Sequence, residues 1–528
     1  NQVMAKKWLS LILTACMVFS LAACGGNTTN NGGSSSDDGA GGKKESIVVA
    51  NSAEADTFYP YNDDNMTSQD EGPVIHNIYE SPLKLMADGS VAPLLAKSWE
   101  ISEDGMEYTL HLRDDVYFHN GKKMTAEDVA FSLNISGASN VGRTLLINYD
   151  TTEVIDDNTV VVHLTAPYAP FLNGLASRVA LVVDKDYLDE VGIDGYESAP
   201  IGTGPYTFAE RASGDHITLL ANENYWGEEP VYKTVTIQLM TDTNTQMLAL
   251  ESGQVDVLLN ASLSPLLMLP EDSPIHYTST DAATIGNIRF NAASPNSIAS
   301  NLDFRKAVQA AINKEDINEG VFEGAAQLTD IYMAPTFTGR PDDADLHVVA
   351  HDLDAARSYL EKSGYNGEEF SIATVSGTRN ETVAQIIQGQ LLELGINCTV
   401  NALDSASFMQ LAYYGDGSGW DACIRAGTVS SLDADGIYTM YNEDYLRSVG
   451  TKSGLIQNDR LTELTALGRI TTDEAERKKI YAEACNIILD QAYEVDLYCD
   501  MNIVAYNEGI EGVEPRALTA VYFFNDWY

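Results

Sequence analysis

The stretch HNIYESPLKLMADGSVAPLLAKSWEISEDGMEYTLHLRDDVYFHNGKKMTAEDVAFSL, residues 76–133, holds the clearest structural signals in the chain. Within it, EISEDGMEYTLHL places the turn dipeptide Asp104-Gly105 between two segments of alternating residues, which predicts a β-hairpin. Thr125, with Asp128 three residues later, predicts a capped helix that runs to about Leu133. The stretch therefore predicts a pair of strands followed by a helix.

The chain before this stretch begins with the features of a secretion signal. Lys6 and Lys7 precede an apolar run, and the run ends on LAAC, residues 21–24. A membrane span needs about 20 apolar residues, and polar residues interrupt this run. We therefore expect residues 1–23 to be a signal peptide.

The four residues that close this signal resemble a bacterial lipobox, in which the cysteine is acylated. The resemblance implies that Cys24 carries lipid, and residues 24–46, rich in Gly, Ser and Asn, then form a flexible tether. The root-mean-square reach of such a tether is on the order of 25 Å. We expect the folded part to lie outside the cell, anchored to the outer face of the cytoplasmic membrane.

Length and charge limit the kind of protein this is. A chain of 528 residues is too long for one hydrophobic core, so two or three domains are expected. Its formal net charge of -46 would be repelled by phosphate backbones, which argues against nucleic acid as a partner.

The cysteines beyond Cys24 point to no metal or redox site. None of Cys398, Cys423, Cys485 and Cys499 forms a CxxC motif or a Cys/His pair with metal-ligand spacing. Each lies in an apolar stretch, which favours buried thiols, with a disulfide as the alternative in an oxidising exterior.

From about residue 290 the pattern alternates between strands and helices, as expected for an α/β domain with a mainly parallel sheet. Thr378 and Glu381, for example, cap a helix that Gly395 ends. On an earlier helix Arg305 is expected in solvent or in a salt bridge. Because residues 47–528 contain no Gly/Ser-rich break, we expect interlaced domains.

The opening stretch resembles the signature region of the extracellular solute-binding proteins of family 5, the peptide and nickel receptors of ABC importers. Later blocks match in the same order: PIGTGPYTF (200–208), NENYWGEEPVY (222–232), ALESGQVDV (249–257) and LDFRKAVQAAINKEDI (302–317). The resemblance implies an α/β, two-lobed periplasmic-binding-protein type II fold. It divides the chain into lobe I at 47–75, 199–285 and 500–528, an inserted subdomain at 76–198, and lobe II at 286–499.

The same resemblance implies a receptor that captures a peptide-like solute between two lobes and delivers it to the permease subunits of an ABC importer. We expect a monomer that binds no cofactor. The chain has no GxSxG or HExxH motif and its eight histidines are scattered, so we expect no enzyme activity and no metal site.

The resemblance also indicates where the solute contacts should lie. In lobe II, Arg425, Ala426 and Gly427 match the oligopeptide receptors, whereas Thr428 and Ser431 replace their aromatic residue and the Asp that holds the peptide ammonium. Either Asp433 or Asp435 could take over the ammonium. On the other wall we expect contacts from Asn65, Met66 and Asp500, the last in a place where relatives often show aromatics.

These departures leave the identity of the solute undecided. A peptide remains the main hypothesis, an oligosaccharide or another non-peptide solute is the alternative, and a surface sensor or adhesion protein without transport is a third possibility.

Overall fold

The computed structural model describes residues 44–61, 72–429, 431–441, 454, 456–518 and 521–528. The predicted signal peptide, the predicted lipidation site Cys24, and the predicted contacts Asn65 and Met66 lie outside the described residues. No helix in the described part is long and apolar enough to cross a membrane.

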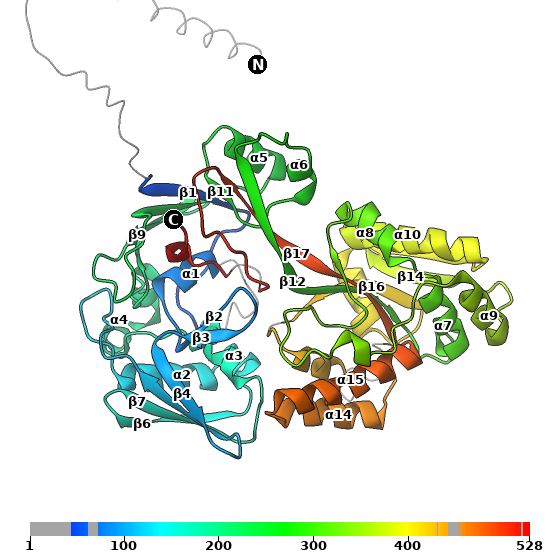
Figure 1. The fold of residues 1–528 in the computed structure, drawn as a ribbon, viewed down its shortest axis with the longest axis horizontal. Helices are drawn as coiled ribbons and strands as arrows, with labels where there is room; N and C mark the ends of the chain where they lie inside the picture. The colour runs from blue at the N-terminus through cyan, green and yellow to red at the C-terminus, as the bar shows by residue number, and fades with distance from the viewer. Residues whose placement is uncertain (1–43, 62–71, 430, 442–453, 455, 519–520) are drawn as a thin grey trace, which may run out of the picture. The chain divides into compact units, whose positions relative to one another are not determined.

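The described residues form a large mixed sheet of eleven strands, with the order β15-β14-β16-β12-β17-β11-β1-β10-β9-β8 and β13 beside β17. At one end lie the strands of lobe I: β1 (Ser46–Asn51), β8 (Tyr206–Ala212), β9 (His216–Ala221), β10 (Thr234–Leu239) and β11 (Val257–Leu258). At the other end lie those of lobe II: β14 (Phe370–Val375), β15 (Cys398–Leu403) and β16 (Ala422–Thr428), while the short β13 (Gln327–Leu328) pairs with β17. The chain is thus a two-lobed α/β protein, as predicted (Figure 1).

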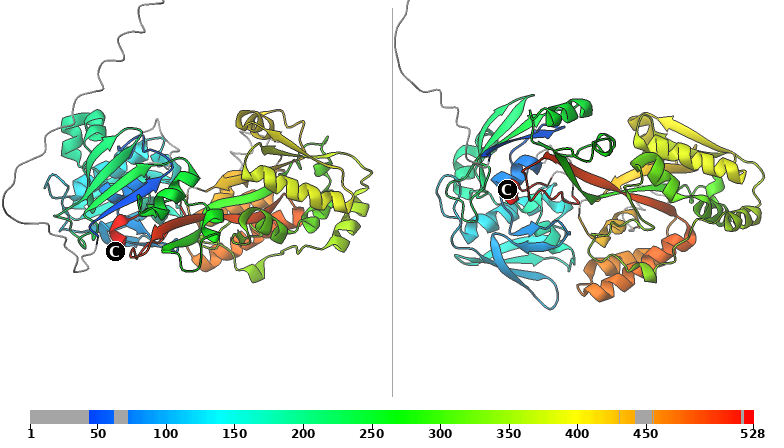
Figure 2. Two further views of the ribbon diagram at one scale, coloured as in Figure 1. Left: turned by 90° about the horizontal axis from the view of Figure 1, so that it is seen from above. Right: turned by 45° about the horizontal axis from the view of Figure 1, so that its top comes forward.

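Two long antiparallel strands, β12 (Ile275–Phe290) and β17 (Glu494–Asn507), connect the two lobes (Figures 1 and 2). Their pairing runs from Ile275 opposite Asn507 to Arg289 opposite Glu494. Register shifts interrupt it between Asp281 and Ile285 and again after Gly286. A Cβ on Gly286 would lie 2.2 Å from the ring of Tyr498, so only glycine fits this close approach.

The opening stretch of the sequence forms the predicted hairpin and capped helix. Strands β4 (Ala96–Ile101) and β5 (Glu107–Leu112) pair around the expected turn, and β7 (Thr159–Leu164) and β6 (Tyr149–Asp156) complete the sheet. Helix α2 (Ala126–Ala138) begins with the capping box of Thr125 and Asp128. The other elements here are α1 (Gly72–Ile78), β2 (Leu83–Leu85), β3 (Val91–Pro93), α3 (Phe171–Leu175) and α4 (Lys185–Ser198).

In lobe II the parallel pairing of β14 with both β15 and β16 confirms the predicted α/β arrangement. Its helices are α7 (Leu302–Ala311), α8 (Lys314–Phe322), α9 (Leu353–Ser363), α10 (Arg379–Leu394), α11 (Ser405–Met409), α12 (Tyr438–Tyr441), α14 (Asp459–Ile470) and α15 (Glu474–Gln491). Gly395, with φ of 91°, ends α10. Two more helices, α5 (Thr243–Glu251) and α6 (Leu263–Leu267), lie on either side of β11 in the chain.

The expectation for Arg305 was wrong. Its side chain is buried, and it donates to the backbone carbonyls of Ala299, Ser300, Gln491 and Ala492. The apolar face of α7 carries this guanidinium into the interior, where it donates hydrogen bonds to carbonyls at the end of α15.

The buried thiols are confirmed, because the four cysteines of the described residues are free and buried. The residue limits of the lobes stay a prediction.

Candidate functional site

A cavity of about 490 Å³ lies against the middle of the β12–β17 pair. Its lining comes from three places: the loop after β11 with the start of α6, the two connecting strands, and the facing ends of α8 and α10. The lining residues are Asn260, Ala261, Ser262, Leu263, Ser264, Ala282, Thr284, Val321, Phe322, Arg379, Asp500, Met501, Asn502 and Ile503. Both lobes and the strands between them therefore contribute to one cavity, a common position for a ligand site.

The lobe I wall is held to the connecting strands by hydrogen bonds. The Ala261 amide donates to the Ile503 carbonyl at 2.8 Å. The Tyr522 hydroxyl donates to Oδ1 of Asn260 at 3.1 Å, while Asn260 itself adopts a left-handed φ of 53°. Asparagine tolerates this conformation better than most residues do. These contacts fix the loop that carries Asn260 and Ser262 to the cavity.

The lobe II wall carries an ion pair. Nη1 of Arg379 donates to Oδ1 of Asp500 at 2.6 Å, and the guanidinium lies 4.8 Å from the centre of the Phe322 ring. The side chains are 47% and 26% exposed, respectively, so both charges remain in contact with solvent. An exposed pair of this kind is worth about 1 kcal/mol or less. A charged solute can therefore exchange with either partner at small cost.

Two of the residues predicted from the sequence meet at this cavity. Asp500 lines it directly. The hydroxyl of Thr428, on β16, lies 2.7 Å from that of Thr284, which lines the cavity from β12. The departure from an aromatic residue at position 428 thus places a small hydroxyl beside the cavity.

Arg425 is not among the described residues that line the cavity, because it lies three positions before Thr428 and points to the opposite face of the sheet. There its side chain, 10% exposed, lies 3.3 Å from the Glu494 carboxylate and donates to Asn287 at 2.9 Å. Burial raises the pKa of Glu494, and the nearby Arg425 opposes that rise. A Cβ on Gly427 would lie 2.0 Å from the Tyr332 hydroxyl on this same face.

The acidic candidates after β16 already have partners within lobe II. Asp433 is 1% exposed and receives two hydrogen bonds from Arg477, at 2.6 and 3.0 Å. Asp435 receives two from Arg469. Ser431 accepts a bond from Asn173 of the subdomain at 3.3 Å. The structure does not bring any of these three residues to the cavity.

Sequence reasoning missed Arg379 and the residues of the loop after β11. Arg379 follows the carboxyl end of β14, a parallel strand, after a single short turn. Ligands of open α/β sheets bind beyond the carboxyl ends of parallel strands. That rule could have singled out this arginine, whereas Asn260 and Ser262 had no signal beyond following a short apolar strand. Among the described residues, no cluster of three or more His, Cys, Asp and Glu could hold a metal ion.

Comparison with known proteins agrees with the two-lobed fold. Residues 90–445 match the model of bacterial extracellular solute-binding proteins, family 5. A nickel-binding periplasmic protein of Escherichia coli is 29% identical over 352 residues, which span 62% of this chain and 66%, just under two thirds, of that protein. A dipeptide-binding protein of the same organism is 26% identical, over 76% of this chain and 79% of its own.

One of the solved structures that are similar across nearly the whole chain holds a bound peptide. It is the ABC transporter-associated periplasmic binding protein DppA from Helicobacter pylori in complex with the peptide STSA. The two chains superpose with a TM-score of 0.70 at 25% identity, over 92% of this chain and 98% of the other.

Proposed function

Because this chain belongs to the bacterial extracellular solute-binding proteins of family 5, we propose that it captures a peptide-like solute for an ABC importer and delivers it to the permease. The observation that carries the solute class is the Arg379–Asp500 pair in the cavity wall. A peptide offers a carboxylate for the arginine and an ammonium for the aspartate, and both contacts are charge-assisted.

The mechanism follows from where the cavity lies. Arg379 and Phe322 belong to lobe II, Asn260 and Ser262 to lobe I, and Asp500 to a connecting strand. A solute that contacts all of them binds best when the lobes are close, so it shifts the population towards the closed form. The permease then receives the form that the solute has selected.

A hydroxyl-rich neutral solute is the alternative. Asn260, Ser262, Thr284 and Asn502 supply amide and hydroxyl groups to the cavity, and these suit an oligosaccharide better than they suit charged termini. A solute of this kind would leave the ion pair intact. A surface sensor or adhesion protein would use the same cavity without uptake.

Calorimetric titration distinguishes these solutes. The proposal expects binding of free tri- and tetrapeptides, weakened about tenfold or more by Arg379→Gln or Asp500→Asn, and weakened similarly when the peptide termini are acetylated and amidated. The matched control is Arg357→Gln, which removes a guanidinium from an exposed pair with Asp354 on α9. If only oligosaccharides bound, and neither cavity variant changed their affinity, the oligosaccharide hypothesis would be favoured over the peptide.

Two further tests address transport and chemistry. Cells that lack the protein should lose uptake of the bound peptide, and unchanged uptake would favour the sensor or adhesion alternative. The named relatives are binding proteins, and we extend that to this chain: peptide recovered after incubation should have its original mass, whereas cleaved product would indicate an enzyme.

We also propose that Cys24 is acylated and that residues 24–46 tether the receptor to the outer face of the cytoplasmic membrane. The sequence LAAC after a basic and apolar segment supports this. Wild-type protein should partition into a detergent phase and Cys24→Ser protein into the aqueous phase. Equal partitioning of the two proteins would rule out a lipid anchor at Cys24.

A further inference from the structure

We propose that Tyr168, Ala169 and the Asp435–Arg469 pair form a latch between the subdomain and lobe II, and that this latch favours the closed arrangement of the lobes before any solute binds. None of these residues lines the cavity of about 490 Å³. The latch therefore goes beyond the proposed function and holds for any solute.

The contact joins residues about 270 to 300 positions apart in the sequence. The Tyr168 hydroxyl donates to Oδ2 of Asp435 at 3.1 Å. Arg469 donates to both oxygens of the same carboxylate, at 2.9 and 2.8 Å. The Arg469 guanidinium also lies over two tyrosine rings, at 3.5 Å from the centre of Tyr438 and 5.4 Å from that of Tyr168.

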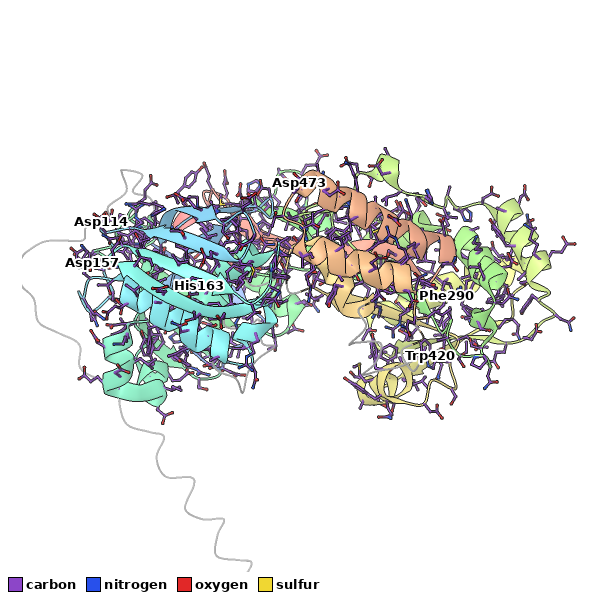
Figure 3. All side chains as sticks on the ribbon, turned by 90° about the horizontal axis from the view of Figure 1, so that it is seen from below. Asp114, Asp157, His163, Phe290, Trp420 and Asp473 are labelled. Atoms are coloured by element: carbon purple, nitrogen blue, oxygen red, sulfur yellow. The ribbon has the colours of Figure 1, made fainter. Side chains whose placement is uncertain are left out.

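A backbone hydrogen bond adds to this contact. The Ala169 amide donates to the Arg469 carbonyl at 2.8 Å. Arg469 is in the last turn of α14, where carbonyls lack partners within the helix. The start of α15 after α14, marked by Asp473, lies beside the subdomain in Figure 3.

The surrounding surfaces are packed as an interior. One continuous buried apolar cluster includes Phe171 from the subdomain and Phe337, Leu432 and Ile437 from lobe II. At its edge Gly89, with φ of 85°, approaches Thr336 so closely that a Cβ would lie 2.6 Å from the Thr336 carbonyl oxygen. The two surfaces therefore fit only because position 89 has no side chain.

Opening this contact costs little in electrostatic terms, so the latch is reversible. Asp435 and Arg469 both belong to lobe II and stay paired when the subdomain moves away. The Tyr168 hydroxyl, the Ala169 amide and the Asn173 amide, which donates to Ser431, exchange their partners for water. The bond from Tyr168 to the Asp435 carboxylate stabilises the closed contact. Opening would be costly only if it left Asp435 or Arg469 buried without its partner, and it does not.

The test measures the distance between the lobes in solute-free protein. Spin labels attached through Asp114→Cys and Glu393→Cys place probes at exposed positions on the subdomain and on α10, while the four described native cysteines are buried. We expect Tyr168→Phe to lower the ratio of closed to open protein about tenfold, the effect of losing one hydrogen bond to a carboxylate.

A second pair of variants tests the latch without relying on correct folding of the Tyr168→Phe protein. Gly89→Ala inserts a methyl group into the contact, whereas Gly121→Ala adds one at a φ of 86° with nothing within 4 Å. Both variants carry the same backbone strain. We expect only the first to lengthen the distance between the labels.

Three results would overturn the latch: a distance distribution unchanged by Tyr168→Phe in folded protein, one unchanged by Gly89→Ala, or an equal shift in Gly121→Ala. Because no solute is present, failure of the latch is separate from failure of the proposed peptide binding.

Discussion

Replacing Arg425 with methionine should destabilise the protein far more than it weakens solute binding. The side chain of Glu494 is 0% exposed, and the guanidinium of Arg425 lies 3.3 Å from its carboxylate. Methionine keeps much of the volume but removes the hydrogen-bonded counter-ion of the buried carboxylate and leaves Arg289 as the other nearby positive charge. It also removes the bond to Asn287. Breaking a buried ion pair from one side typically costs about 3–5 kcal/mol.

The loss should depend on pH. Burial already raises the pKa of Glu494, and loss of Arg425 raises it further. A carboxyl group whose pKa is higher in the folded than in the unfolded state contributes stability at low pH and loses it as the pH rises. We therefore expect the full loss of about 3–5 kcal/mol near pH 8 and a smaller loss near pH 5, where Glu494 can take up a proton.

Urea unfolding, followed by tryptophan fluorescence at both pH values, measures this loss, and Arg425→Met/Glu494→Gln is the control. The double variant removes both charges and should recover most of the stability. The reasoning would be refuted if Arg425→Met unfolded like the wild type while solute affinity fell. Arg425 would then contact the solute, as its resemblance to the oligopeptide receptors implies.

Other expectations can be tested on the same protein. Burial raises the pKa of Glu80 to about 7, although hydrogen bonds from Thr203, Tyr225 and Trp226 oppose the rise. The contribution of Glu80 to stability should therefore fall as the pH rises from 6 to 8. Glu80→Gln should remove that part of the pH dependence in urea titrations. Arg305→Lys should lower the free energy of unfolding by about 2 kcal/mol, since an ammonium cannot reach the four carbonyls that the guanidinium bonds; an unchanged urea midpoint would contradict this. The four buried cysteines of the described residues should react with a thiol reagent only after unfolding, and labelling of native protein would show that one of them is accessible.

Local signals predicted the elements of the fold well. The turn at Asp104-Gly105 and the capping box at Thr125 depend on residues within a few positions, and both formed as expected. The face on which a strand residue lies depends on more distant partners. Arg425 points away from the cavity because Glu494, about seventy residues later in the chain, and Asn287, on β12, receive it.

The same distinction explains the site. Asp500 was found because alternation along its strand and comparison with relatives drew attention to it. Arg379 has no local motif and acquires a role only because α10, which follows β14, begins beside Asp500 of β17. The buried position of Arg305 had no sequence signal, since its partners are carbonyls, which every residue carries.

The irregular pairing of β12 with β17 gives the molecule a mechanical property. The register shift between Asp281 and Ile285 lies where Ala282 and Thr284 line the cavity. If the lobes rotate about this shift, a solute in the cavity binds at the pivot. A small rotation at a pivot becomes a large displacement at the tips, such as the turn at Gly89. A small solute can therefore change the separation of large surfaces on the two lobes. A dye attached near a tip should report binding more sensitively than one placed beside the solute.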